Sequence, residues 1–254
     1  MTAVRVFILA VAVVMISTSC NQAATDVQPT DKTDEVRTLH FRILLTELDR
    51  SSSDQIQNAL EQNYARVKSD LQVDTLPVIT VTFHPNGEEF REAAQMGNLP
   101  SWVVGIATSS TQLHLVSPSS PDAGRSFDEM MKIMVHEFTH CVTLNMNQTF
   151  ANNPRWLWEG VSLYEAGQFS HPSRLTGWQS GNLPTLDYLN SNWQTNTDVY
   201  TAGYVLVEYI VQTWSKEKLV QLIKSNGDIS GSLGLSVQAF EEGWWQFMRT
   251  KYGG

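Results

Sequence analysis

Cysteine is scarce in this chain of 254 residues, which contains only Cys20 and Cys141. Two cysteines exclude a disulfide-stapled scaffold, so side-chain packing or a bound metal must hold the fold together. The material for a core is present, because 42% of the residues are hydrophobic and the chain has eight Trp and ten Phe. This composition predicts a folded domain with a sizeable apolar core and argues against disorder over most of the chain.

Basic residues are also few: 17 Lys and Arg stand against 26 Asp and Glu, which gives a formal net charge of −9. A chain with this balance lacks the basic surface that attracts phosphate backbones, so we predict no nucleic-acid partner. An acidic surface commonly serves solubility, and the charge by itself indicates no particular ligand.

One apolar run is long, VFILAVAVVMI at residues 6–16. As a helix it falls short of the ~30 Å hydrocarbon core of a membrane. It follows Arg5 and precedes small residues, which is the order of a signal peptide, so we predict a signal peptide over residues 1–19 and export of the protein. The sequence STSC at residues 17–20 resembles a bacterial lipoprotein signal, with serine where leucine is usual. That resemblance implies a lipid anchor at Cys20 on the extracytoplasmic side of the cell membrane, and secretion without an anchor is the alternative.

The remainder of the chain divides into three parts. Residues 20–37 are polar and lack apolar periodicity, which predicts a flexible tether. Residues 38–125 alternate strand-like runs with short helical patterns, and residues 126–254 are mainly helical. No linker separates the two, so we predict one α+β unit over residues 38–254, with a small mixed sheet and its helices first and a helical lobe second.

A helix is predicted from Ser126 to about Met146, because Ser126 and Glu129 form the S-x-x-E pattern of a capping box. His136 and His140 are four residues apart within it, so they lie on the same helix face. Their imidazole nitrogens could therefore reach one ion. Zinc accepts such ligands and requires at least a third from the protein, with a position left open for water.

Glu137 completes an HExxH motif and points about 100° around the helix from the first histidine. This places it beside a metal rather than on it, where it could take a proton from a zinc-activated water. The alternative is a metal-free helix with two ordinary histidines, since the motif arises by chance about once in a hundred chains of this length and composition.

A carboxylate on the next predicted helix could complete the site. That helix begins near Pro154, ends at Gly167 and carries Glu159, with eighteen residues between His140 and Glu159. The short connection at residues 147–153 lets it fold back on the first helix, which would give a His2Glu zinc site. Glu159 could instead be a solvated charge, but its apolar neighbours predict a buried segment, where an unpaired carboxylate is costly.

HExxH, eighteen residues and then glutamate within W-x-x-E-G-x-x-x-Y resembles the gluzincin metallopeptidases, in particular the Peptidase MA-like group. The flanking segments SWVVGIATSSTQLHLVSP and YTAGYVLVEYIVQTW are similar to that group as well, so the resemblance covers about residues 38–250. It implies a zincin-like α+β fold with the active site between the two lobes. It further implies one Zn2+ ion held by His136, His140 and Glu159, with Glu137 as general base and acid.

The resemblance also implies a side chain that stabilises the oxyanion. Tyr200 opens a Y-x-x-G pattern, ending at Gly203, that matches the aminopeptidase branch, so Tyr200 is the candidate and Tyr204 the second choice. Either could instead be an aromatic of the helix core.

Aminopeptidases of this group bind a free N-terminus through a glutamate in a Gly-rich strand, and the corresponding stretch here, GIATSSTQLHL, has no acidic residue. We therefore predict an endopeptidase, or a narrowly specific peptidase, acting on peptide or protein substrates. The substrate is expected to pair with an edge strand around residues 111–116, with His114 as a candidate contact. Two alternatives stay open: a zinc-stabilised binding or scaffolding lipoprotein without peptidase activity, and a metal-free domain with a chance motif.

The other histidines, His40, His84 and His171, have no ligand-spaced partner in the sequence, and we predict structural or surface positions for them. Cys141 directly follows the motif and turns away from the face of the two motif histidines, which predicts a small core residue rather than a nucleophile.

Overall fold

The structure is a computed structural model that describes residues 34–95, 99–191 and 195–253. The predicted signal peptide (1–19) and the lipidation site at Cys20 lie outside the described residues. Within the described ranges, no helix combines the length and the apolar character that crossing a membrane requires.

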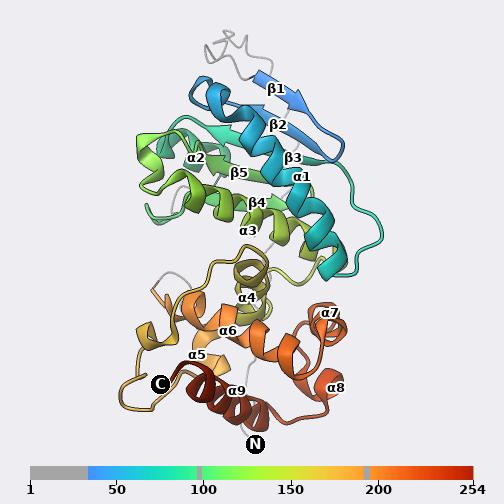
Figure 1. Ribbon diagram of the computed structural model, residues 1–254, viewed down its shortest axis with the longest axis vertical. Coiled ribbons are helices and arrows are strands. Elements are labelled where there is room, and N and C mark those ends of the chain that lie inside the picture. Colours follow the sequence, from blue (N-terminus) through green and yellow to red (C-terminus); the bar gives the residue numbers. More distant parts are fainter. Residues whose placement is uncertain (1–33, 96–98, 192–194, 254) are drawn as a thin grey trace, which may run out of the picture. The chain divides into compact units, whose positions relative to one another are not determined.

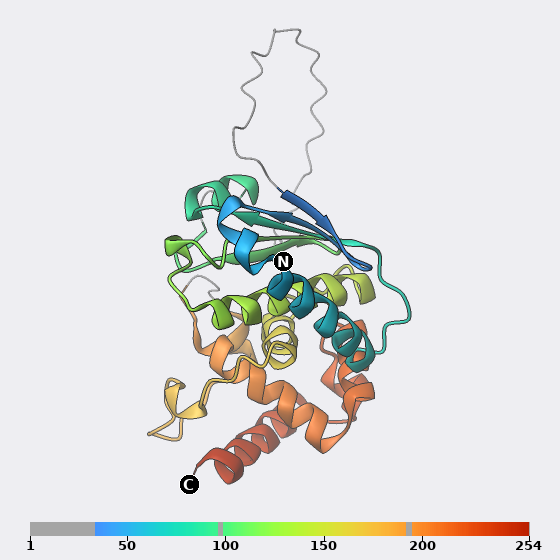
Figure 2. The same ribbon diagram turned by 45° about the horizontal axis from the view of Figure 1, so that its top comes forward.

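The first lobe is built on a sheet, as its β-branched runs predict. Helices α1 (Ser53–Asp70) and α3 (Phe127–Met146) lie across the same face of this sheet (Figures 1 and 2). The elements that precede α3 in the chain are β1 (Asp34–Arg37), β2 (Phe41–Leu45), the 3-10 helix η1 (Glu47–Ser52), α1 (Ser53–Asp70), β3 (Ile79–His84), α2 (Gly87–Ala93), β4 (Gly105–Ser109), β5 (Gln112–Val116) and the 3-10 helix η2 (Pro121–Ala123).

The sheet is mixed, and the strands of the described residues follow the order β1-β2-β3-β5-β4. β2, β3 and β5 run parallel, while β1 and β4 pair antiparallel with β2 and β5. The edge strand next to α3 is therefore β4. The prediction of an edge at residues 111–116 is wrong, because that segment forms β5 between two neighbours. β5 pairs with β3 after a connection that contains β4, so the first strand of the β4–β5 hairpin is left outermost.

The expected tether at residues 20–37 also needs correction, since its last four residues form β1. This strand pairs with β2, and its Asp34 and Glu35 form ion pairs with Arg50 and Arg42 at 2.6 and 2.8 Å. Backbone pairing and side-chain charges hold a strand that has almost no apolar pattern. The rest of the expected tether lies outside the described residues.

Alternation along the central strands decides which face of the sheet is buried. Ile79 and Val81 of β3 are fully buried on the face that α1 and α3 cover, whereas Thr80 and Thr82 are half-buried on the other. Phe138 of α3 lies edge-on to Phe41 of β2, with 5.4 Å between ring centroids, which fixes α3 on the sheet. The apolar residues that recur at helical spacing on α1 are all buried: Ile56, Leu60, Tyr64 and Val67.

The second lobe is helical, as predicted from Ser126 onward. The capping box of Ser126 and Glu129 is formed in both directions at the start of α3. Figure 1 shows α4, α6 and α9 on the opposite side of α3 from the sheet. The elements are α3 (Phe127–Met146), α4 (Arg155–Glu165), the 3-10 helix η3 (Pro172–Arg174), α5 (Leu186–Asn190), α6 (Asp198–Thr213), α7 (Lys216–Lys224), α8 (Ile229–Leu233) and α9 (Val237–Tyr252).

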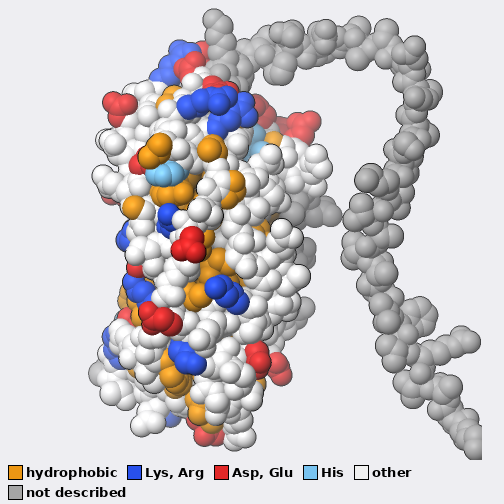
Figure 3. All heavy atoms as spheres, turned by 90° about the vertical axis from the view of Figure 1, so that its right-hand side faces the viewer, with side chains coloured by type: hydrophobic (Ala, Val, Ile, Leu, Met, Phe, Trp, Pro, Cys, Tyr) orange, Lys and Arg blue, Asp and Glu red, His pale blue; other side chains and the backbone are white. Residues whose placement is uncertain are grey.

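The surface carries charges of both signs. On the face drawn in Figure 3, acidic and basic side chains are interspersed, with no broad field of one sign. Such a mixed surface favours solubility, which agrees with the general role given to the net charge of −9.

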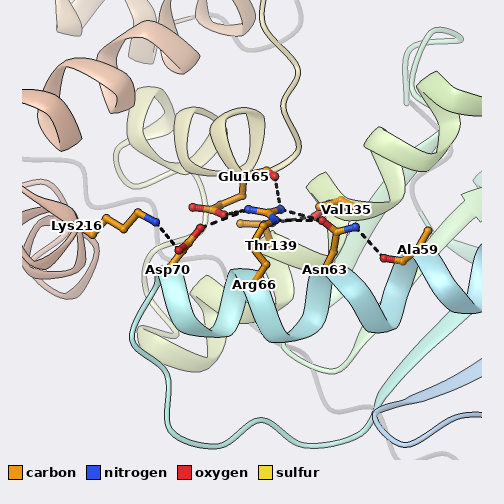
Figure 4. Close-up of polar contacts among 8 residues, drawn as sticks. All are labelled: Ala59, Asn63, Arg66, Asp70, Val135, Thr139, Glu165 and Lys216. Atoms are coloured by element: carbon orange, nitrogen blue, oxygen red, sulfur yellow. Dashed lines mark hydrogen bonds and ion pairs between the residues drawn. The ribbon is translucent and has the colours of Figure 1, made fainter.

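An ion-pair network joins α1 to the end of α4 and to α7 (Figure 4). Arg66 donates from Nη1 to Glu165 Oε2 at 2.6 Å and from Nη2 to the backbone oxygen of Glu165, so it also caps α4. Asp70 pairs with Arg66 at 3.5 Å and with Lys216. The Glu165 side chain is only 2% exposed, and this burial raises the pKa of Glu165 to about 7 even though the charge of Arg66 lowers it.

We expect Arg66→Met to lower the free energy of unfolding by about 2 kcal/mol near pH 8, because it leaves a buried carboxylate without its partner. The loss should shrink at about pH 5.5. The folded-state pKa of Glu165, about 7, lies above its ordinary 4.5, so the folded side chain is mostly protonated at pH 5.5. Removal of Arg66 leaves an unpaired carboxylate only as the pH rises through about 7. Urea unfolding at the two pH values measures both losses. Adding Glu165→Gln to Arg66→Met should restore most of the stability at the higher pH, and an equal loss at both pH values would contradict this account.

Candidate metal centre

The two motif histidines lie side by side on the face of α3 that turns away from the sheet. His136 and His140 are both buried, and their ring centroids are 4.6 Å apart. The other side of α3 carries Phe138 and Cys141, which are fully buried in the core. Burial on both sides fixes the rotation of the helix, so the histidines face the second lobe.

Glu159 reaches the same point from α4. Its Oε2 lies 3.3 Å from His136 Nε2 and 3.8 Å from His140 Nε2, and its side chain is 12% exposed. The three donor atoms lie within 4.8 Å of one another, and the described residues contain no other such group of His, Cys, Asp and Glu. The structure therefore brings the three predicted ligands together.

The second nitrogen of each histidine is also held. His140 Nδ1 lies 2.9 Å from Ser162 Oγ, and His136 Nδ1 lies 2.8 Å from Gln168 Oε1. Both Nε2 atoms are thereby left to face Glu159. Sequence reasoning missed both partners. Ser162 could have been found, since it follows Glu159 by one helical turn, but Gln168 lies beyond the end of α4.

The pKa values of the two imidazoles shift in opposite directions. For His136, burial lowers the pKa, but the hydrogen bond to Glu159 and the charges of Glu137 and Glu159 raise it above its ordinary value overall. For His140, burial and the charge of His136 both lower the pKa, to well below the ordinary value. One imidazole is therefore kept neutral beside a carboxylate, as a metal ligand requires.

Glu137 is directed at the edge of the sheet instead of the three converging donors. Its Oε2 accepts a hydrogen bond from the backbone nitrogen of Ala107 in β4 at 2.9 Å. Burial raises the pKa of Glu137 to about 7, against the lowering effects of His136 and of that N–H group. Gly105 makes room for this side chain, since a Cβ there would lie 3.0 Å from Glu137 Cγ and closer still to Ile133 and Leu115.

Tyr200 lines the same cleft from α6, whereas Tyr204 turns away from it. The ring of Tyr200 lies edge-on to Trp102 at 5.8 Å and 5.6 Å from the Arg155 guanidinium carbon. Burial and the charge of Glu159 raise the pKa of Tyr200, and a hydrogen bond from Arg155 lowers it. Its hydroxyl therefore stays protonated at neutral pH and can donate. Tyr204 packs 5.3 Å from Tyr164.

α4 and α6 touch at two glycines. A Cβ on Gly203 would lie 2.9 Å from Gly160 Cα, and a Cβ on Gly160 would lie 2.7 Å from the Gly203 backbone oxygen. Gly160 follows Glu159, and Gly203 follows Tyr200 by three residues. The contact thus sets Glu159 and Tyr200 on the same side of one helix pair and explains why the sequence has glycine at both places.

These residues border a cleft of about 1260 Å³ between the two lobes. The rim on the sheet side is β4, and the floor is α3 and α4. Among the described residues that line it, Glu137 and Glu159 are the only acidic ones.

The remaining histidines lie elsewhere. His84 and His114 are on neighbouring strands, where His84 Nε2 lies 3.0 Å from His114 Nδ1, so their pairing across the sheet was missed. His114 therefore does not stand on the edge strand. His40 bonds Glu61 at 2.6 Å. Cys141 is fully buried, as predicted, and burial raises the pKa of its thiol.

A comparison with protein families decides the classification. The family model described as the Peptidase MA superfamily matches residues 59–247, a range that includes all three converging donors. The chain belongs to the Peptidase MA superfamily. No curated protein matches the chain. The family and the His-His-Glu cluster together indicate a metal-dependent peptidase, with a sheet lobe, a helical lobe and the site between them.

The donor set of this Peptidase MA domain fits a zinc ion. Two imidazole nitrogens and one carboxylate oxygen are the ligands of a catalytic zinc that keeps a position open. Each histidine has a hydrogen-bond partner on its other nitrogen, as metal-ligating histidines usually do.

Gly203→Ala should lower the free energy of unfolding by about 1–3 kcal/mol, because the new Cβ would meet the backbone of α4. This loss is expected although alanine favours a helix more than glycine does. Urea unfolding provides the measurement. Gln212→Ala, at an exposed position of the same helix, is the control and should leave the stability unchanged or slightly higher. Unchanged stability in Gly203→Ala would show that the helices have room to spare.

Proposed function

We propose that the protein is a zinc-dependent endopeptidase of the gluzincin type. The observation that carries the proposal is the convergence of His136, His140 and Glu159 at a cleft in which Glu137 stands beside, and not within, the donor set. Zinc held by these three residues would polarise the peptide carbonyl and acidify the attacking water.

The other site residues have separate tasks. Glu137 takes a proton from the attacking water and delivers it to the leaving amine. The bond from the Ala107 backbone nitrogen holds the Glu137 carboxylate at the sheet edge during this transfer. Tyr200 donates a hydrogen bond from its hydroxyl to the oxyanion of the tetrahedral species. The Arg155 guanidinium packs on the ring of Tyr200.

The substrate strand is proposed to pair with β4 instead of β5. Val116 donates to the backbone oxygen of Val104, so the residues that bond β5 alternate with Gly105 and Ala107, whose backbone groups face the free edge. Because the Ala107 nitrogen already donates to Glu137, a substrate would pair through Gly105 and the Ala107 backbone oxygen. A peptide strand added there would lie along the cleft next to Glu137. Backbone pairing gives affinity without reading the side chains, which suits an enzyme that cuts within a chain.

The acidic residues of the cleft support an endopeptidase. Binding of a free amino terminus requires a carboxylate that pairs with the substrate ammonium group. The two acidic residues among the described cleft residues are Glu137, the proposed general base, and Glu159, the proposed zinc ligand, so neither is available for that pairing. We further propose, from the sequence of residues 1–20, that the enzyme is exported and lipid-anchored at Cys20, so that its substrates are extracytoplasmic.

Glu137→Gln should reduce peptide cleavage by about 10²–10⁴-fold while zinc binding is retained, because the variant keeps the ligands and loses the proton acceptor. A peptide library cleaved by the wild type provides the assay, and the bound metal is measured on the same samples. Glu88→Gln on the exposed face of α2 is the matched control and should cleave as the wild type does. A wild type that binds zinc and cleaves nothing would favour the scaffolding alternative.

Tyr200→Phe should lower kcat by about 10²-fold with little change in KM, because only the transition state uses the hydroxyl. Tyr204→Phe is the control: Tyr204 packs on Tyr164 outside the cleft, and because the variant keeps the ring, the loss of the hydroxyl should leave both constants unchanged. Equal kinetics for the wild type and Tyr200→Phe would remove Tyr200 from the mechanism.

A further inference from the structure

The support of His136 comes from a residue outside the motif and outside the helices that carry the ligands. Gln168 Oε1 lies 2.8 Å from His136 Nδ1. An amide oxygen only accepts hydrogen bonds, so this contact keeps a hydrogen on Nδ1 and leaves Nε2 for the side of His140 and Glu159. We propose that Gln168 is a positioning residue that fixes the tautomer and the orientation of His136 as a metal ligand. This inference rests on the proposed zinc site.

The partner of the other histidine behaves differently. Ser162 Oγ lies 2.9 Å from His140 Nδ1, and a hydroxyl can donate or accept. Ser162 therefore holds the ring of His140 without selecting its tautomer. Gln168, which turns its amide oxygen to Nδ1 of His136, favours the ligand form of that imidazole, which makes it the sharper test.

Gln168 is set in place by the way α4 ends. Gly167 has φ +62°, and the Gln168 backbone nitrogen donates to Leu163 O while that of Gly167 donates to Tyr164 O. This pair of bonds is the Schellman arrangement, which fixes the chain direction just beyond a helix. Because the same helix carries Glu159, the cap ties the position of Gln168 to that of the third ligand.

The next residue, Phe169, holds the segment from its other side. Its ring centroid lies 5.3 Å from that of Tyr204 on α6 and 5.4 Å from that of Tyr252 on α9. Tyr252 in turn donates to Glu208 of α6. The last turn of α9 and the middle of α6 thus form an aromatic support for the segment that carries Gln168, and this support is far along the chain from the HExxH motif.

The test compares the zinc affinity of purified full-length variants by competition with a chromophoric chelator. Gln168→Met keeps the length of the side chain and removes the acceptor, and it should weaken zinc binding by about 10–100-fold. Gln168→Glu keeps an acceptor and should stay within about threefold of the wild type. Gln148→Met, an exposed glutamine of the same cleft, should bind zinc as the wild type does. Thermal unfolding of the metal-free proteins should give the same midpoint for all four within a few degrees.

A second comparison tests the aromatic support. Phe169→Ala should weaken zinc binding in the wild-type background, and this effect should vanish in the Gln168→Met background, because both changes act through one contact. A Gln168→Met protein that binds zinc as tightly as a zinc-binding wild type would overturn the role of Gln168 alone. A wild type that binds no zinc would overturn the metal site as well, so the two failures are distinguishable.

Discussion

α4 meets α6 at Gly160 and Gly203, where the absence of two side chains lets the helix backbones touch. Glu159 stands one residue before the first glycine and Tyr200 three before the second. Any side chain at either glycine would push the helices apart, and the carboxylate would move away from histidines that are fixed on another helix. The distance between Glu159 and the two histidines therefore depends on the close contact of these glycines.

The helix that carries the histidines is fixed independently. α3 is held against the sheet by Phe138 and against β5 by Cys141, whose thiol faces the Gln112 backbone oxygen. α4 is pulled toward the same lobe at its end, where Arg66 of α1 reaches Glu165 and the last carbonyl (Figure 4). These contacts of α3 with the sheet and of α1 with the end of α4 join the two lobes beside the candidate metal centre and keep the three donors together.

The electrostatics of the centre favour a cation. Two carboxylates, Glu137 and Glu159, and two imidazoles lie together out of water, and burial raises the pKa of Glu137 to about 7. Charged groups gathered in a low-dielectric site are costly without a compensating charge. A divalent ion among the donors would supply that charge and favour the ionised carboxylates.

Much of this arrangement could be predicted from the sequence. Helical spacing placed His136 and His140 on one face, and the capping box at Ser126 fixed where their helix begins. Glu159 followed from the family resemblance and from a predicted helix hairpin. The histidine pair and the start of its helix depend on local patterns, which a single sequence shows directly, whereas Glu159 needed the spacing known from the family.

The parts that could not be predicted depend on contacts distant in the chain. The order of β4 and β5 is decided by which strand pairs with β3, and the sequence of neither strand shows this pairing. Residues 34–37 were predicted to belong to a tether because they lack an apolar pattern. They form β1 because their acidic side chains pair with Arg42 and Arg50 of other elements. Gln168 lies beyond the end of α4, after Gly167 in a left-handed conformation, so helical spacing could not predict which way its side chain points.

β4, and not β5, is the edge strand that borders the cleft. β4 holds Glu137 through the Ala107 backbone nitrogen, and its neighbouring backbone groups at the same edge are directed toward the cleft. In the proposed mechanism, a peptide that pairs with this edge would be aligned against the strand that already holds Glu137. Binding of the substrate and placement of the proposed proton acceptor would then share one rigid element. The register of the scissile bond with Glu137 would follow from backbone pairing, whatever side chains the substrate carries.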